Sequence, residues 1–350
     1  MSKLHYEWTL KDANFTKDKG KVFSCFACGG GSTMGYKLAG FDVIGHNDID
    51  KRMIEVYKAN HNPKYSFLES ITTFAKRKDL PKELYELDIL DGSPPCSSFS
   101  MAGKREKDWG KQKKFKEGQT KQVLDTLFFD FIDLAKELQP KVVISENVKG
   151  LLSGKAKKYV REIYKKFSEA GYNCQHFLLD ASRMGVPQRR ERVFFVCLRK
   201  NLSKPFLIRK DMFTEVPELH LNFNQKQIPF KEIVENSMNR NDLPNSDIKY
   251  WENAKEKGRA FLKNGNKFGF FYKALNDLVC ATIDTTSRYA ISESKHLLLD
   301  AELIKIGTFP KDYNFNKNKP QYIIGMSVPP IMIYNIAREI NKQWLNKLEL

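Results

Sequence analysis

The most restrictive feature of this sequence is the regular alternation of short apolar runs with helix-like segments over its first 200 residues. The apolar runs end at glycine, proline or polar residues, as buried strands do, and the intervening segments have helical spacing. Strands are predicted at 22–26, 41–45, 87–90, 141–145 and 192–197, and helices at 32–39, 50–60, 122–138 and 159–170. This alternation predicts an α/β fold with a mostly parallel, Rossmann-like sheet and helices on both faces.

The alternation stops near residue 200. From 201 to 273 the chain is polar, rich in Asn and Lys, and interrupted by four prolines. An apolar-faced helix returns after Ile323 and can pack back on the first domain. We therefore predict a first domain over 1–200, a smaller irregular lobe over 201–277, and a C-terminal segment over 278–350.

The charge balance narrows the class of partner. Lys and Arg number 59 against 42 Asp and Glu, for a formal net charge of +17. Such a field attracts polyanions, nucleic acid first and an acidic membrane surface second, although a low-GC genome also produces lysine-rich chains. No apolar stretch is long enough for a signal peptide or a membrane span, so we expect a soluble, cytoplasmic protein. The six cysteines are scattered, which predicts reduced thiols and no metal site.

A glycine-rich turn follows the first predicted strand. Phe26 to Gly31 joins that strand to a helix, where glycines allow a ligand to approach the backbone and the helix N-terminus offers free N–H groups. The pattern is neither the dinucleotide fingerprint nor a P-loop. Asp48 lies about twenty residues on, at the end of the second strand, where it can bind a ribose diol. Together they favour an adenosine-containing cofactor.

A second turn carries a cysteine. Cys96 follows Pro94 and Pro95 just past a strand end, where it has little to pack against and where open α/β sheets bind ligands. A thiolate there is a plausible nucleophile.

The next segment, 104–121, interleaves basic residues with Trp109 and Phe115. We interpret it as a flap that closes on a phosphate backbone, the alternative being a solvated loop. The residues predicted to bind DNA there are Lys104, Arg105, Lys107, Lys111, Lys113 and Lys114.

Two further strand ends carry polar groups. Glu146 ends one apolar strand, where a carboxylic acid near the cysteine can protonate or hold a ring nitrogen. Arg190 and Arg192 precede the following strand, and they can reach a base oxygen and hold the acid in place.

In order and spacing these motifs resemble those of the bacterial and phage cytosine-C5 DNA methyltransferases. The matching segments are Phe26 to Gly31, Pro94 to Cys96, Glu146 to Val148, Gln188 to Val193, Leu297 to Tyr313 and Gly325 to Pro330. The resemblance implies transfer of a methyl group from S-adenosylmethionine, with S-adenosylhomocysteine as product, to C5 of a cytosine flipped out of duplex DNA.

The resemblance also assigns roles to single residues. Cys96 adds to C6 of the base, Glu146 contacts N3 and the exocyclic amine, Arg192 contacts O2, and Arg190 supports the site. The implied cofactor-binding residues are Phe26, Cys28, Gly30, Gly31, Asp48, Ile49, Ser70, Ile71, Leu127, Ser327 and Val328. The sequence departs from the family pattern at four of its positions, which are Cys28, Ser70, Ser97 and Met326.

By the same resemblance, 1–200 is the catalytic domain and 201–277 recognises the target sequence. Arg209, Arg240 and Arg259 lie in that lobe and suit phosphates and base edges. Two alternatives remain: a tRNA cytosine methyltransferase, although its Cys-Phe-Thr hallmark is absent, and a catalytically silent DNA-binding relative. We expect a monomer that acts on duplex DNA, either alone or beside a separately encoded restriction endonuclease.

Overall fold

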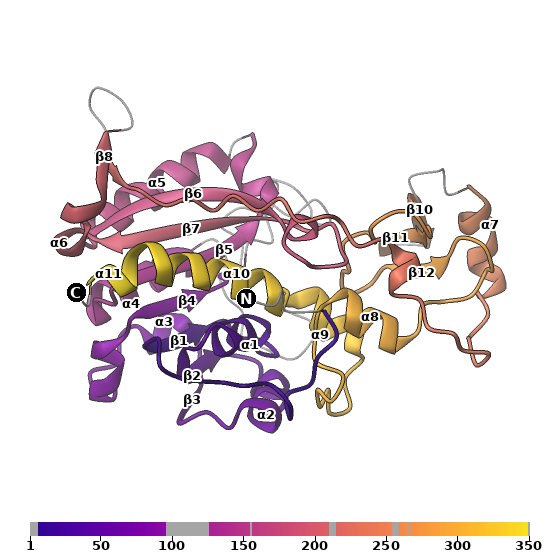
Figure 1. Ribbon diagram of the computed structural model, residues 1–350, viewed down its shortest axis with the longest axis horizontal. Coiled ribbons are helices and arrows are strands. Elements are labelled where there is room, and N and C mark those ends of the chain that lie inside the picture. The colour runs from indigo at the N-terminus through magenta and orange to yellow at the C-terminus, as the bar shows by residue number, and fades with distance from the viewer. Residues whose placement is uncertain are drawn as a thin grey trace. The chain divides into compact units, whose positions relative to one another are not determined.

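The computed structural model describes residues 6–95, 126–154, 156–209, 215–253, 259–264 and 267–348. The chain forms two compact units, coloured by residue number in Figure 1. The larger unit comprises Asn14–Leu179, Glu191–Asn222 and Tyr334–Leu350. The smaller unit comprises Met1–Ala13, Asp180–Arg190 and Phe223–Ile333. The segment predicted as a recognition lobe, 201–277, is thus divided between the two units after residue 222.

The larger unit is built on a seven-stranded sheet in the order β3-β2-β1-β4-β5-β7-β6. Its strands are β1 Lys21–Cys25, β2 Asp42–Asp48, β3 Tyr65–Leu68, β4 Ile89–Gly92, β5 Val142–Val148, β6 Tyr172–Asp180 and β7 Glu191–Arg199. Strands β1 to β5 pair in parallel, and β7 pairs antiparallel to β5. The prediction of an α/β fold with a mostly parallel sheet is confirmed. Strands β3 and β6, at the two edges, are additions to it.

Short-range signals set the limits of the helices. Asp50 caps α2 by accepting a hydrogen bond from the Arg52 backbone N–H at 2.9 Å, and Asn62 ends that helix in a left-handed conformation with φ of 43°. Gln139 ends α4 in the same way, directly before Pro140. These helices are α1 Gly31–Leu38, α2 Lys51–His61, α3 Ile71–Phe74, α4 Leu127–Leu138, α5 Ala156–Glu169 and α6 Lys200–Ser203.

The two faces of the sheet have different chemistry. On one face Phe23, Leu90 and Val143 join a buried apolar cluster with residues of α3, α4 and α5. On the other face Ser24 and Asp91 point toward α1, since side chains alternate along a strand. The polar face carries Asp91, which lies close to the candidate active site.

The remainder of the larger unit is short. Strands β8 Leu207–Arg209 and β9 Glu215–Pro217 form a small antiparallel pair. Helix α10, Pro330–Ile340, crosses from the smaller unit and continues through a π-helical turn into α11, Asn346–Leu348. The buried Trp344 in that turn donates to the Glu218 carbonyl at 2.7 Å, which fastens the C-terminal helices to this unit.

The smaller unit joins the N-terminal residues to elements from the second half of the chain. It contains α7 Asn245–Asn253, β10 Arg259–Asn264, β11 Lys267–Ala274, β12 Arg288–Ile291, α8 Asp300–Ile306 and α9 Pro320–Met326. The indole N–H of Trp8 donates to the Thr308 carbonyl at 2.9 Å, and the Leu10 N–H donates to Asp312 at 2.7 Å. Across the described ranges, no helix combines the length and the apolarity that crossing a membrane requires.

Candidate active site

The turn after β1 is strained and ends in an open helix N-terminus. Phe26, Cys28 and Gly30 all have positive φ angles, of 53°, 47° and 80°. Gly30 caps α1 without a side-chain hydrogen bond, so the first N–H groups of the helix are available to an anionic or polar ligand. A β-carbon on Gly30 would lie 2.3 Å from His61 Nε2, so glycine is required both by conformation and by space.

Asp48 ties this turn to the end of β2. Its Oδ2 accepts from the Cys28 N–H at 2.8 Å, and its Oδ1 accepts from the Asp50 N–H at 2.9 Å. Burial raises the pKa of the Asp48 carboxyl to about 6, against the lowering effect of these backbone donors. A carboxylate can accept about four hydrogen bonds, so Asp48 keeps capacity for the hydroxyls of a ribose.

Three of the predicted cofactor residues meet in one apolar cluster. Ile71 and Leu127 are buried members of it, and Phe26 packs against it. Ser70 caps α3 by accepting from the Thr73 N–H at 3.1 Å, and Ile49 is half-buried directly after Asp48. These residues supply apolar surface beside the polar acceptors of the turn.

Glu146 and Arg192 form an ion pair at the carboxyl end of β5. The antiparallel pairing of β5 with β7 brings Arg192 Nε within 2.8 Å of Glu146 Oε1, and the two side chains are only 15% and 12% exposed. The neighbouring Asn147 donates from Nδ2 to the Pro94 carbonyl at 3.2 Å. The turn that leads into Cys96 is therefore attached to the strand that carries Glu146.

Arg190 lies in the smaller unit and has a different environment from Arg192. Its buried guanidinium donates to the carbonyls of Ile283, Gly325 and Ser327 at 2.8–3.0 Å. It thereby holds the segment that carries Ser327 and Val328. The Ser327 hydroxyl oxygen is buried, and among the described residues it has no hydrogen-bond partner.

Several predicted residues lie outside the described ranges. They are Cys96, the predicted flap 104–121, and its basic residues Lys104, Arg105, Lys107, Lys111, Lys113 and Lys114. Their roles stay predictions.

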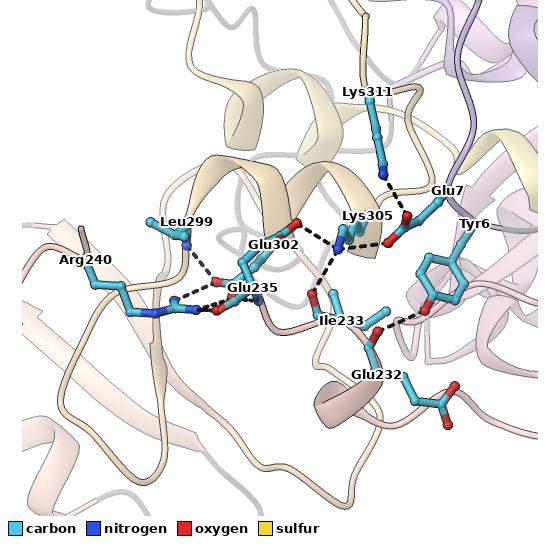
Figure 2. A network of polar contacts seen from close by, with 10 residues as sticks. All are labelled: Tyr6, Glu7, Glu232, Ile233, Glu235, Arg240, Leu299, Glu302, Lys305 and Lys311. Carbon is cyan, nitrogen blue, oxygen red and sulfur yellow. Dashed lines mark hydrogen bonds and ion pairs between the residues drawn. The ribbon is translucent and has the colours of Figure 1, made fainter. Parts of the chain in front are cut away.

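The interpretation of Arg240 as a DNA-binding residue is wrong. Its side chain is only 8% exposed and pairs with Glu302, at 2.7 Å from Nη2 to Oε1 and 3.1 Å from Nη1 to Oε2. Glu302 also accepts from the N–H groups of Glu235 and Leu299, as Figure 2 shows. All the Arg240 contacts in this view are internal, so its charge serves the fold of the smaller unit.

The same polar network reaches the N-terminal residues. Lys305 pairs with Glu7 at 2.8 Å and with Glu235 at 2.7 Å, and Lys311 also pairs with Glu7 (Figure 2). The two lysines lower the pKa of Glu7 to about 2. Glu7, Glu235 and Glu302 each face a cation, and the Glu7–Lys305 pair ties the N-terminal residues to α8.

One buried acid close to the predicted site was given no role by the sequence reasoning. Asp91 is buried in β4 with both carboxylate oxygens hydrogen-bonded, to Ser24 at 2.8 Å and to Tyr36 at 3.0 Å. The available signal was an acid inside an otherwise apolar strand, directly before the Pro94-Pro95 turn.

Both a family model and individual protein sequences match this chain, and they indicate the same family. A family model for C-5 cytosine-specific DNA methylases matches residues 20–342. The type II methyltransferase M.NgoPII of Neisseria gonorrhoeae is 29% identical over 349 residues, covering 92% of this chain and 95% of that protein. The type II methyltransferase M.FnuDI of Fusobacterium nucleatum is 38% identical over 183 residues, about half of each chain (52% and 48%).

A solved structure shares the fold. A candidate DNA modification methyltransferase encoded within an E. coli prophage superposes with a TM-score of 0.63 over 92% of this chain and 99% of that one. At 19% identity this similarity supports the fold alone.

Proposed function

The chain belongs to the family of C-5 cytosine-specific DNA methylases, and on that premise we propose that Cys96, Glu146 and Arg192 form its reaction centre. The protein is a DNA (cytosine-5-)-methyltransferase that uses S-adenosylmethionine, as its family does. The observation that carries the proposal is the largely buried Glu146–Arg192 pair beside the turn that leads into Cys96.

The residues present fit S-adenosylmethionine. Asp48 offers carboxylate oxygens for ribose hydroxyls, and the open N-terminus of α1 offers N–H groups to a carboxylate. The half-buried Phe26 and Ile49 offer apolar surface to the adenine, with the buried Ile71 and Leu127 in the cluster against which Phe26 packs. Ser327, in the smaller unit, has a buried hydroxyl without a partner in the described ranges, and its role toward the cofactor stays a prediction of the family resemblance. When bound, the cofactor supplies an electrophilic methyl group.

The chain's own residues activate the base. C5 of cytosine becomes nucleophilic only after addition at C6, so the Cys96 thiolate forms an Sγ–C6 bond and the electron pair of the C5–C6 double bond moves to C5. Glu146 holds N3 and the exocyclic amine, and Arg192 both orients Glu146 and contacts O2. After methylation, loss of the C5 proton expels the Cys96 thiolate and restores the ring. The base must leave the duplex stack for this chemistry.

We further propose that the enzyme recognises a specific duplex sequence and acts as a monomer. Two kinds of relative support two roles, either beside a restriction enzyme or alone. M.NgoPII is named a type II methyltransferase, and a protein of Bacillus phage SPR is named an orphan methyltransferase. The first role implies a separately encoded restriction endonuclease as partner, whereas the second does not.

Expression in a host without cytosine methylation, followed by bisulfite sequencing of its DNA, tests the function. We expect a cytosine within one short recurring sequence to be methylated at C5 and therefore to resist bisulfite conversion. This methylation should require an intact Cys96. Methylation of host tRNA in place of DNA would favour the tRNA alternative. Absence of methylation from both, with DNA binding retained, would favour the silent relative.

A further inference from the structure

Asp91 is a buried acid without a cationic partner in the described part of the chain. It is 2% exposed, and among the described residues no Lys, Arg or His forms an ion pair with it. Within the described ranges its two oxygens accept only from neutral hydroxyls, those of Ser24 and Tyr36. A buried carboxylate held by two neutral donors is costly, because its desolvation is only partly offset. An Asn or apolar residue would fill this position at lower cost.

The partners of Asp91 lie on the two elements that flank the proposed cofactor turn, strand β1 and helix α1. Ser24 stands in β1 two residues before the strained turn, directly opposite Asp91 in the β1–β4 register. Tyr36 stands in α1, the helix that this turn opens. Asp91 itself is followed by Gly92, Ser93 and the turn into Cys96. One carboxylate therefore connects the cofactor turn, its helix and the strand that leads to the nucleophile.

Asp91 also shares a sheet face with Glu146. The β4–β5 register places Asp91 opposite Ile144, and Glu146 lies two residues further along that strand on the same face. Burial, with a smaller contribution from the charge of Glu146, raises the pKa of Asp91 to about 7, while the Ser24 and Tyr36 hydroxyls lower it. The other titratable groups that respond to the charge of Asp91 are Cys25, Tyr36 and Tyr57.

We propose that Asp91 is a positioning residue for methyl transfer, whose ionised carboxylate fixes the cofactor turn and the turn into Cys96 relative to each other. This inference rests on the proposed function of Cys96. Both hydroxyls donate to the carboxylate, so protonation of Asp91 replaces one acceptor site with a donor and disturbs the Ser24–Asp91–Tyr36 contact. The arrangement that aligns the two turns is therefore present only in the ionised form.

The test compares Asp91→Asn with a matched control, Asp88→Asn. Asp88 precedes the same strand at the opposite end, is also buried, and binds the Lys21 N–H and Lys141 Nζ, both at 2.7 Å. We expect Asp91→Asn to lower kcat by at least about tenfold, since small misplacements at a reaction centre are expensive. Its Tm should not fall, because a buried charge is removed. Asp88→Asn should lower Tm and leave kcat unchanged.

The pH profile supplies the readout that a purely structural role would not change. Wild-type kcat should fall with an inflection near pH 7 as the pH drops, and Asp91→Asn should lack this inflection. Tyr36→Phe removes only one donor to the carboxylate, so its inflection should move to higher pH. Wild-type kcat in Asp91→Asn, or an inflection that neither variant alters, overturns the proposal.

Failure of this proposal is distinguishable from failure of the proposed function. Formation of a denaturant-resistant adduct with 5-fluorocytosine DNA reports on Cys96. If Cys96→Ser retains the adduct, the proposed function fails. If Cys96→Ser loses it while Asp91→Asn forms it at the wild-type rate, only the role of Asp91 fails.

Discussion

Two buried acids, one in each unit, show two uses of charge in this protein. Glu302 in the smaller unit is fully buried and accepts from the Arg240 guanidinium and from two backbone N–H groups. Asp91 in the larger unit is almost as buried, yet of the residues that the structure describes only Ser24 and Tyr36 donate to it. Glu302 is compensated as a structural charge must be, whereas Asp91 is left close to its point of titration at neutral pH.

The difference teaches where function lies. In the polar network around Glu302, charges join the chain start to α8 and to residues 232–240 (Figure 2). At the carboxyl ends of β2, β4 and β5, by contrast, Asp48, Asp91 and Glu146 gather at the edge where open α/β sheets bind ligands. Changes at the first place should reduce stability, and changes at the second should reduce activity.

Glu146→Gln should have the largest effect. It removes the group proposed to hold N3 of the base, so initial rates of methyl transfer should fall by about 10²–10⁴-fold. Glu191→Gln is the control, because the Glu191 side chain is 41% exposed and, among the described residues, its carboxylate pairs only with the exposed Lys149. Activity of Glu146→Gln within about tenfold of wild type would remove Glu146 from the reaction centre.

Glu302→Ala should lower the stability of the fold and should not act directly on the rate of methyl transfer. It leaves the buried Arg240 without an anion, and the expected loss is about 3–5 kcal/mol in denaturant unfolding of the smaller unit. The double variant Glu302→Leu with Arg240→Met removes both charges and should recover most of this loss. Equal stability of the single variant and the wild type would contradict the structural role of the pair.

Gly30→Ala should weaken binding of the cofactor. The added methyl group clashes with His61 and stands at a φ of 80°, so the turn must shift, and we expect the Kd for S-adenosylmethionine to rise about tenfold. Gly171→Ala has a similar positive φ of 95° but open space, its nearest contact being Gln139 Oε1 at 3.8 Å. Calorimetry should therefore find unchanged cofactor affinity in Gly171→Ala. A similar rise in both variants would exclude a specific role for the turn.

The pH dependence of Glu7 should be the smallest effect. Its pKa is lowered to about 2, so its pairs with Lys305 and Lys311 stabilise the fold fully above the ordinary carboxyl pKa of about 4.5. That contribution is lost as the pH falls through about 2, and because the Glu7 and Lys311 side chains are 29% and 52% exposed, solvent screening holds it to about 1 kcal/mol. Glu7→Gln should show a flatter stability curve between pH 5 and pH 3. Identical curves would show that these pairs are without net effect.

The sequence predicted best what depends on neighbouring residues. The strand–turn–helix at Phe26 to Gly31 is a local pattern, and the structure has it within one residue of the predicted place. The strand predicted at 87–90 lies at Ile89–Gly92, so Asp91 is inside it and not in the turn that follows. The edge strands β3 and β6 were missed because they are partly exposed and mix polar with apolar residues. Central strands are buried on both faces, so they form continuous apolar runs that are easier to recognise in the sequence.

Long-range pairing limited the rest. Arg240 resembles any other arginine of a basic lobe until Glu302, 62 residues away, is placed against it. Arg190 likewise binds carbonyls 93 to 137 residues away. Asp91 was overlooked because its partners come from β1 and α1, 67 and 55 residues distant. Such contacts are set by topology, which the local pattern does not encode.

The most direct test of the reaction centre is covalent trapping. Duplex DNA with 5-fluorocytosine at the methylated position cannot lose the C5 substituent, so the Sγ–C6 bond should persist after methyl transfer. Wild-type protein with S-adenosylmethionine should give an adduct that survives denaturation, and peptide mapping should place it on Cys96. An adduct that forms equally well with Cys96→Ser, or that maps to another residue, would contradict the assignment.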